Sequence, residues 1–156
     1  MKHSPLQLLR YVVTDIACTA NPQFNPEQEI QGALEEYSIS AKANPLEPTK
    51  DVPGHSWSVE LSVTQKKKEG QNLPYEFRLS MVGIFSCKDG VLDSERETRF
   101  VQVNGSSMLY GMAREHIRAL TAAGPWGAII IPTMSFYEKK EQLHKEDASA
   151  KSEPGQ

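Results

Sequence analysis

The sequence predicts an α+β domain in which a four-stranded antiparallel sheet is covered by two helices. In the first half of the chain apolar and polar residues alternate, which is typical of strands with one buried face. In the second half apolar residues recur every three or four positions, which is typical of a helix. A chain of 156 residues fits one domain. We expect this domain to span 1–143, followed by a disordered tail over 144–156 whose polar sequence buries too little apolar surface to fold.

Four segments have the composition and alternation of strands, at 6–18, 32–43, 56–64 and 75–87. The polar turn over 66–73 joins the third segment to the fourth, and this short connection predicts a hairpin. Gly83 interrupts the alternation of the fourth segment, which indicates either a bulge or a close backbone contact. Together these segments predict an antiparallel sheet with one face that needs cover.

A loop rich in proline and asparagine, 19–26, follows the first predicted strand. Pro22 and Pro26 prevent regular structure there, so we expect a long crossing connection. The loop carries a single aromatic residue, Phe24, which we expect to fold back onto the sheet.

Helical spacing of apolar residues becomes clear from Ser106 or Ser107 onward, and Asn104 or one of these serines is expected to cap the helix. Gly124 and the proline after it are expected to end the helix. The preceding stretch, 95–103, is compatible with a helix or with an extended approach. The apolar stretch 126–132 is compatible with a fifth strand or with an extended segment packed on the core. A second helix is expected to begin at Ser135.

The charge and motif content argues against several classes of function. A net charge of −3 and the lack of a basic stripe do not favour nucleic acid, and the basic run 66–68 is interpreted as a solvated turn rather than a phosphate-binding patch. The four histidines are scattered and no CxxC or HExxH motif occurs, so we expect no metal site and no cofactor. His116 is interpreted as a packed histidine rather than a general base. Asp15, Glu35 and Glu36 could pair as acid and base, but carboxylates on exposed strand faces are ordinary, and we expect the protein not to be an enzyme.

Cys18 and Cys87 are interpreted as two core residues, although one bridge between them is compatible with the sequence. The first residues lack the apolar region and cleavage site of a signal peptide. No apolar run approaches the length of a membrane-spanning helix. We therefore expect a cytoplasmic protein that does not insert into the membrane.

Apolar residues are concentrated in the predicted loop and linker and at the opening of the second predicted helix. These candidate residues are Phe24, Trp126, Ile129, Ile131, Met134 and Phe136. One interpretation is that they fill the core or an oligomer interface. The other is that aromatic and adaptable methionine side chains line a groove that binds extended apolar polypeptides without sequence specificity.

Three stretches of the sequence resemble the SecB family of export chaperones. Residues 14–22, with Phe24 shortly after, are similar to the family's "kDiSFE-P-aP" segment at the end of its first strand. The family's "GIF" motif is present at 83–85. Residues 109–136 align without gaps with "LFPYARE-I--L---G", the apolar linker after it and "P-NF". The resemblance is weak over 26–71 and strong over 83–137.

The resemblance implies an ATP-independent holdase that assembles as a tetramer, a dimer of dimers, and holds unfolded or nascent polypeptides. Client binding is implied for long apolar grooves beneath the crossing loop and beside the second helix, and the six candidate residues above fall in or near those regions. Docking of the SecA translocase motor is implied for Asp15, but Thr19 stands where the family has a glutamate. Gly111 and Met112 likewise replace a Pro-Tyr pair. An alternative within the family is a chaperone dedicated to an antitoxin in a toxin–antitoxin–chaperone system, and a remote alternative is an enzyme of unrecognised type.

Overall fold

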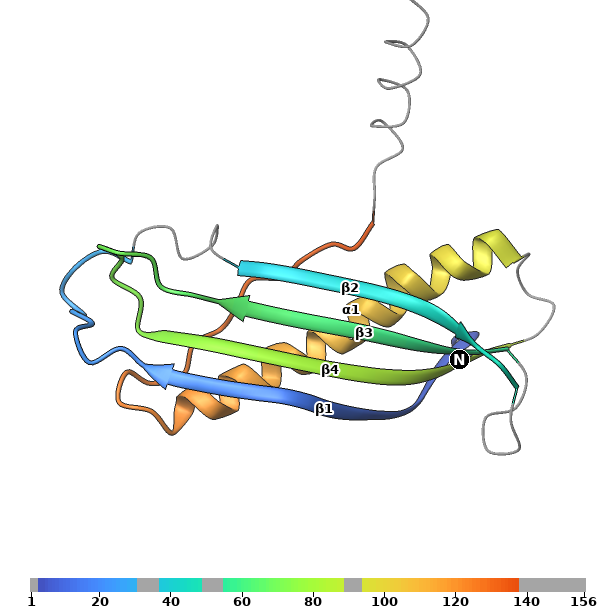
Figure 1. Cartoon of the computed structure of the whole chain (residues 1–156), viewed down its shortest axis with the longest axis horizontal. Helices are drawn as coiled ribbons and strands as arrows, with labels where there is room; N and C mark the ends of the chain where they lie inside the picture. The colour runs from blue at the N-terminus through green and yellow to red at the C-terminus, as the bar shows by residue number, and fades with distance from the viewer. Residues whose placement is uncertain (1–2, 31–36, 49–54, 89–93, 138–156) are drawn as a thin grey trace, which may run out of the picture.

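The computed structural model describes residues 3–30, 37–48, 55–88 and 94–137. Within them the chain forms four strands and one helix (Figure 1). These elements are β1 (Leu6–Ala20), β2 (Tyr37–Leu46), β3 (His55–Gln65), β4 (Tyr75–Cys87) and α1 (Ser94–Ala122). The strands make one antiparallel sheet in the order β1-β4-β3-β2, so β1 and β2 are its two edges. The predicted antiparallel sheet is confirmed, and β2 continues past Ala43, where the sequence had placed its end.

Alternation along β3 and β4 separates a buried face from a polar face. On β3 the side chains of Trp57, Val59, Leu61 and Val63 are buried, whereas those between them are exposed or half-buried. Helix α1 lies diagonally across the buried face (Figure 1), and Val101, Leu109 and Ile117 pack into the core from it. The opposite face is rich in serine and threonine, and Ser62 and Ser80 hydrogen-bond across it at 2.8 Å. One sheet and one helix thus bury a single apolar layer between them.

Helix α1 begins at Ser94, well before the predicted start. The residues expected to cap it lie in its interior: Asn104 Nδ2 donates to the carbonyl of Phe100 (2.8 Å), and Ser107 Oγ donates to that of Val103 (2.7 Å). The predicted start and caps are therefore wrong, and the helical alternative for 95–103 is correct. Intrahelical bonds of this kind satisfy these side chains without a helix end.

The first turn of α1 is fixed to β3 by a buried carboxylate. Glu97 accepts a hydrogen bond from Trp57 Nε1 at 2.8 Å, and His55 Nδ1 lies 3.0 Å from its other oxygen. Further along, the helix approaches the sheet closely at Gly83 and Gly105. A Cβ added to Gly83 would lie 2.9 Å from Leu109 Cδ2, and one added to Gly105 would lie 2.9 Å from Val59 Cγ2. Gly83 therefore marks a close backbone contact, since the register of β4 runs through it without a shift.

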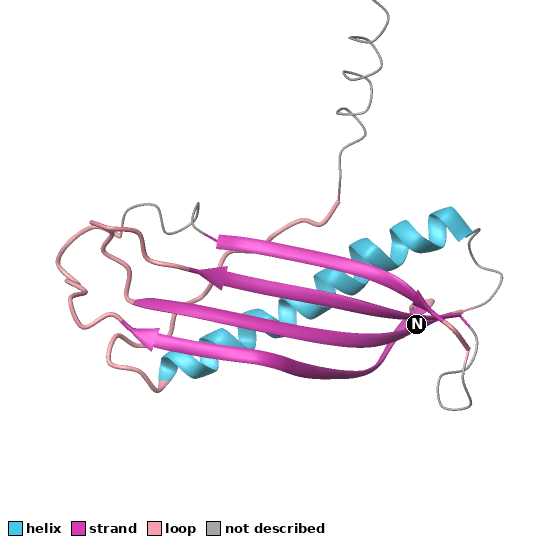
Figure 2. Cartoon of the chain, viewed as in Figure 1, coloured by secondary structure: helices cyan, strands magenta, loops and turns pink. Residues whose placement is uncertain are grey.

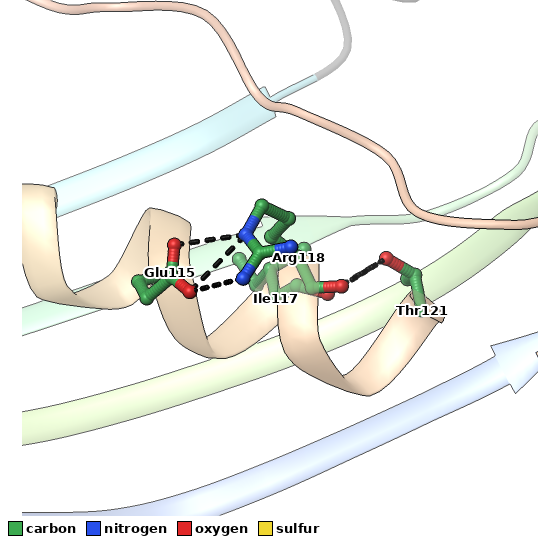
Figure 3. Close-up of polar contacts among 4 residues, drawn as sticks. All are labelled: Glu115, Ile117, Arg118 and Thr121. Carbon is green, nitrogen blue, oxygen red and sulfur yellow. Dashed lines mark hydrogen bonds and ion pairs between the residues drawn. The ribbon is translucent and has the colours of Figure 1, made fainter. Parts of the chain in front are cut away.

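The C-terminal end of α1 carries two local contacts, which Figure 3 shows. Thr121 Oγ1 donates to the carbonyl of Ile117 at 2.8 Å, and Arg118 Nε lies 2.9 Å from Glu115 Oε2. The helix ends at Ala122, just before Gly124, as the sequence predicts. A Cβ at Gly124 would lie 2.6 Å from Tyr75 Oη, so this close approach needs glycine.

Residues 123–137 contain no helix and no strand (Figure 2). The fifth-strand alternative for 126–132 is therefore wrong, and the extended alternative is correct. Residues 135–137 are not helical, so the second helix does not begin at Ser135. The remainder of that helix, the end of the domain at 143 and the tail 144–156 lie outside the described residues.

Two further sequence interpretations can be compared with the structure. Cys18 and Cys87 are free; Cys18 pairs with Phe77 and Cys87 with Leu6, at opposite ends of the β1–β4 ladder. The single-bridge alternative is therefore wrong, because the two thiols are separated by most of the length of two strands. None of the described helices has both the length and the apolar content needed to cross a membrane.

Candidate functional site

The apolar segment, as we call residues 126–137, is attached to the end of α1 by two buried side chains. Tyr75 Oη donates to the carbonyl of Thr121 (3.1 Å) and accepts from the backbone N–H of Trp126 (3.0 Å). Thr121 Oγ1 accepts from the backbone N–H of Ile129 at 3.0 Å. These bonds use backbone groups of the segment, so they fix its course without using its apolar side chains.

Two further side chains of α1 hold the middle of the apolar segment. Arg114 Nε donates to the carbonyl of Ile131 at 3.0 Å, and Tyr110 Oη donates to the carbonyl of Pro132 at 2.7 Å. Burial raises the pKa of the Tyr110 hydroxyl, so it stays protonated and able to donate. The segment thus returns behind the sheet from the side of β1 to the side of β2 (Figure 1).

An aromatic pair marks the beginning of the apolar segment. The rings of Phe24 and Trp126 meet edge to face, with centroids 5.3 Å apart. Trp126 Nε1 also donates to the carbonyl of Asn21 at 2.9 Å, so the crossing loop and the segment are joined. Both rings are half-buried. Phe24 was expected to fold back onto the sheet; the ring contact that it makes is instead with Trp126 of the apolar segment.

A second aromatic pair marks the other end, next to β2. Tyr110 and Phe136 meet edge to face at 5.7 Å. Beside them is a hollow of about 320 Å³ lined by Ile39, Ala41, Arg99, Gln102, Val103, Ser135, Phe136 and Tyr137. The guanidinium of Arg99 lies 5.2 Å from the centre of the Tyr137 ring. The hollow therefore lies between the edge strand β2, the first half of α1 and the end of the apolar segment.

The six candidate residues differ in exposure. Phe24, Trp126, Ile129 and Phe136 are half-buried, and Met134 is 46% exposed. Ile131 is fully buried in the core, so in this conformation its side chain packs against the helix and sheet rather than facing a client. Ile130 (72% exposed) and Tyr137 (65% exposed) present more apolar surface than any of the six. The sequence also did not single out Tyr110 or Gln102, because their roles depend on contacts between distant elements.

A second apolar surface lies on the flank of β1. Strand β1 exposes Leu9, Tyr11, Val12 and Ile16, and the nearby helix exposes Met108 and Leu120. A hollow of about 220 Å³ lies between Tyr11 and a row of helix residues that includes His116 and Met112. The rings of Tyr11 and His116 are 6.0 Å apart. His116 is therefore a ring-packed histidine at the boundary of this flank.

The polar face of the sheet contains Asp15, the candidate for motor docking. Arg78 pairs with it through Nε and through Nη2, the latter at 3.0 Å from Oδ1. The Arg78 hydrogen bond holds the pKa of the Asp15 carboxyl below its usual range. Next to this pair is a hollow of about 890 Å³ lined by Tyr37, Ser38, Thr64, Lys66, Lys67, Lys68 and Arg78. At this end of the face the three lysines and Arg78 outnumber the carboxylates of Asp15 and Glu76.

In the part of the chain that the structure describes, no group of three or more His, Cys, Asp or Glu side chains is placed to hold a metal ion. The described hollows are lined mostly by apolar side chains, aromatic rings and long cations, with single carboxylates at Glu76 and Glu115. Such linings can bind a polypeptide or another protein surface.

Solved structures with the same architecture exist. A SecB-like chaperone of Mycobacterium tuberculosis in complex with a ChAD peptide from the HigA1 antitoxin has a TM-score of 0.55 to this chain, at 13% identity over 83% of this chain and 91% of that chain. The chain has a SecB-like fold. A protein of unknown function from Streptococcus agalactiae has a TM-score of 0.54, at 11% identity over 81% of this chain and 96% of that chain. No protein-family model matches the sequence, and no curated protein matches it.

The SecB-like fold that the motifs implied is therefore confirmed at the level of architecture. The sheet order and the position of α1 rest on the structure of this chain. At identities this low the comparison establishes the fold and leaves the function to be argued from the two apolar flanks.

Proposed function

We propose that the protein is an ATP-independent chaperone, a holdase, that binds unfolded polypeptides along the apolar segment. The observation that carries this proposal is that backbone hydrogen bonds fix the segment while several of its apolar side chains stay exposed. Ile130, Met134 and Tyr137 are exposed. A half-buried pair of rings, Phe24 and Trp126, lies at one end, and at the other the half-buried ring of Phe136 packs on the buried Tyr110. A segment that only filled the core would bury these groups, as Ile131 does.

Physical chemistry supports a client of low sequence specificity. Exposed apolar groups in a row recognise apolar polypeptide through burial of surface, which has no directional requirement. Met134 adds an adaptable side chain. Neither apolar burial nor the backbone bonds that hold the segment require nucleotide or covalent chemistry, so we propose a binding protein and not an enzyme.

We further propose that the chain assembles through the flank of β1, as the tetramer implied by the resemblance to SecB. Large apolar side chains are exposed there on both the strand and the helix, including Tyr11, Ile16 and Met108. A patch of this kind on a small domain is typical of a protein–protein contact. Assembly on this flank leaves the end of the apolar segment next to β2 open to clients.

Between the two client hypotheses, the charges favour a dedicated polypeptide such as an antitoxin over motor docking. The solved SecB-like chaperone holds an antitoxin peptide. In this chain Asp15 is already paired with Arg78, and Lys66, Lys67 and Lys68 lie near that pair. A face with these charges attracts an acidic partner more than a basic one.

The holdase proposal is tested by light scattering from a chemically denatured client that is diluted into buffer containing the purified protein without nucleotide. We expect aggregation to be suppressed near a stoichiometric ratio of chaperone assembly to client. Aggregation that proceeds at the rate seen with an inert protein of similar size would contradict the proposal. Affinity capture from native cells then separates the client hypotheses, since recovery of the SecA motor as main partner would contradict the antitoxin version.

A further inference from the structure

Strand β2 is an edge of the sheet, and one side chain of α1 bonds to that edge. The backbone N–H of Ala43 donates to Gln102 Oε1 at 2.7 Å, and Gln102 Nε2 donates to the carbonyl of Ala41 at 3.0 Å. Strand β3 lies on the other side of β2. The Gln102 carboxamide therefore makes the two bonds, one accepted and one donated, that the C=O and N–H of one residue in a parallel added strand would make at this position.

The same geometry shows which other groups of β2 face outward. In an antiparallel ladder, alternate residues direct both backbone groups to the same side. Since Ala41 and Ala43 bond to Gln102, Tyr37 and Ile39 direct their N–H and C=O groups to the open edge as well. Pro45 also belongs to the alternate residues that face outward, but it has no N–H to donate. Pairing beyond Ala43 is therefore limited. Among the described residues, the stretch of β2 that can pair with an added strand therefore runs from Tyr37 to Ala43.

The surroundings of this edge differ along its length. Beside Ile39 and Ala41 lies the apolar hollow of about 320 Å³ that also contacts Phe136. Beside Tyr37 lies the hollow of about 890 Å³ lined by Lys66, Lys67, Lys68 and Arg78. A segment laid along the edge would meet apolar groups at one end and cations at the other.

We infer that an extended polypeptide segment adds to the edge of β2 as a further strand and displaces the Gln102 carboxamide. Its alternate apolar side chains occupy the hollow at Phe136, and its acidic residues lie against the cations near Tyr37. This inference rests on the proposed function and specifies how a client is held, through its backbone as well as its side chains. Backbone pairing adds affinity without adding sequence specificity.

The test uses the full-length protein and a short synthetic peptide with alternating valine and threonine and acidic residues at one end. A matched peptide is N-methylated at the amides that would face β2, so it keeps the side chains and loses the donors. A second matched peptide carries lysine in place of the acidic residues. We expect each matched peptide to bind about tenfold or more weakly.

A variant of the chaperone tests the role of Gln102. In Gln102→Ala the edge is open before the peptide arrives, so the original peptide is expected to bind several-fold more tightly. Hydrogen exchange at the amides of Ile39 and Ala41 is expected to slow when the peptide binds. Should the variant be less stable, the methylated peptide still tests the inference on the unaltered protein.

Three results would overturn the inference. The N-methylated peptide could bind as well as its parent, which would show that backbone pairing is absent. Exchange at Ile39 and Ala41 could be unchanged by the peptide. Gln102→Ala could double the native mass without peptide, which would show that the edge pairs with a second copy of the chain. In each of these cases the unaltered protein would still suppress client aggregation. If the unaltered protein does not suppress aggregation, the holdase proposal itself fails.

Discussion

The two edges of the sheet are protected in different ways, and the difference separates their roles. The β1 ladder has two register shifts, between Leu8 and Arg10 and between Val13 and Asp15. Bulges of this kind deform an edge permanently and discourage pairing with another strand. The β2 ladder is regular, and its open side is bonded by the side chain of Gln102. The Gln102 side chain can rotate away from β2 and free that edge for pairing. A bulge is part of the backbone of β1 and stays in place.

The exposed apolar side chains also differ between the β1 flank and the β2 flank. On the β1 flank it is part of regular elements, because Tyr11 and Ile16 belong to the strand and Met108 to the helix. On the β2 flank it belongs to the irregular apolar segment and to the hollow beside it. Rigid apolar surface suits a partner of fixed shape such as a second copy. Apolar side chains on an irregular segment suit partners whose shapes vary.

The largest effect is expected from charges placed on the β1 flank. In Tyr11→Asp with Ile16→Asp, assembly would bury two carboxylates without partners, which costs several kcal/mol. We expect the native mass to fall to that of a smaller species, with the fold kept because both positions are partly exposed in the single chain. Native mass spectrometry measures this. Ile130→Asp is the matched control and should keep the assembly; dissociation in the control would place the interface on the wrong flank.

The next largest effect concerns the first aromatic pair. Phe24→Ala with Trp126→Ala removes two half-buried rings from the apolar segment and its neighbouring loop. We expect client binding to weaken by about 2 kcal/mol or more, as for aromatic anchors in general. Titration with a labelled unfolded polypeptide measures this change. A variant that binds normally but loses its native mass would indicate that the pair fills an oligomer interface.

A smaller effect is expected from the hydroxyl that attaches the apolar segment to α1. Tyr75→Phe leaves the Trp126 N–H without its partner and removes one of two donors to the Thr121 carbonyl, which keeps the Gly124 N–H. We expect the free energy of unfolding to fall by about 1–3 kcal/mol and hydrogen exchange at Trp126 to quicken. Chemical denaturation and exchange measurements test this. Tyr137→Phe, on an exposed ring, should change neither value.

The smallest effect is a pH dependence from the carboxylates near β1. Hydrogen bonds from Arg78 and Arg118 lower the pKa values of Asp15 and Glu115 respectively. A carboxyl with a lowered folded-state pKa stabilises the fold above its unfolded pKa, and this stability is lost as pH falls through the folded value. We expect the denaturation midpoint to be level from pH 7 to about 5 and to fall below about pH 4. Arg78→Gln should flatten part of this fall; an unchanged curve would show that the Asp15 pair contributes nothing.

The strands could be predicted from the sequence because each central strand buries every second side chain. The start of α1 could not, because the residues that it buries in its first four turns are mostly not apolar. Glu97, Gly105 and Ser106 face the core there, with Val101 as the large apolar residue among them. Glu97 is satisfied by Trp57 from a different element, and the Ser106 hydroxyl has no partner among the described residues. A search for apolar periodicity cannot detect such a face.

Only part of the candidate site could be predicted, again because the sequence shows local pattern and not contacts between distant residues. Aromatic residues in irregular segments can be seen in the sequence, and the structure brings Phe24 and Trp126 together. The burial of Ile131 and the exposure of its neighbour Ile130 depend on the bond from Arg114 to the Ile131 carbonyl. That bond, like the Gln102 contact with β2, joins residues far apart in the chain. Local pattern contains no information on such contacts.

The central claim is that this chain binds polypeptides because they are unfolded. Calorimetric titration of the full-length protein with a permanently unfolded polypeptide, such as reduced and carboxymethylated α-lactalbumin, tests this claim most directly when the folded form of the same polypeptide is the control. Without nucleotide, we predict saturable binding of the unfolded form with a negative heat-capacity change, and no binding of the folded form. Equal binding of both forms, or of neither, would contradict the account.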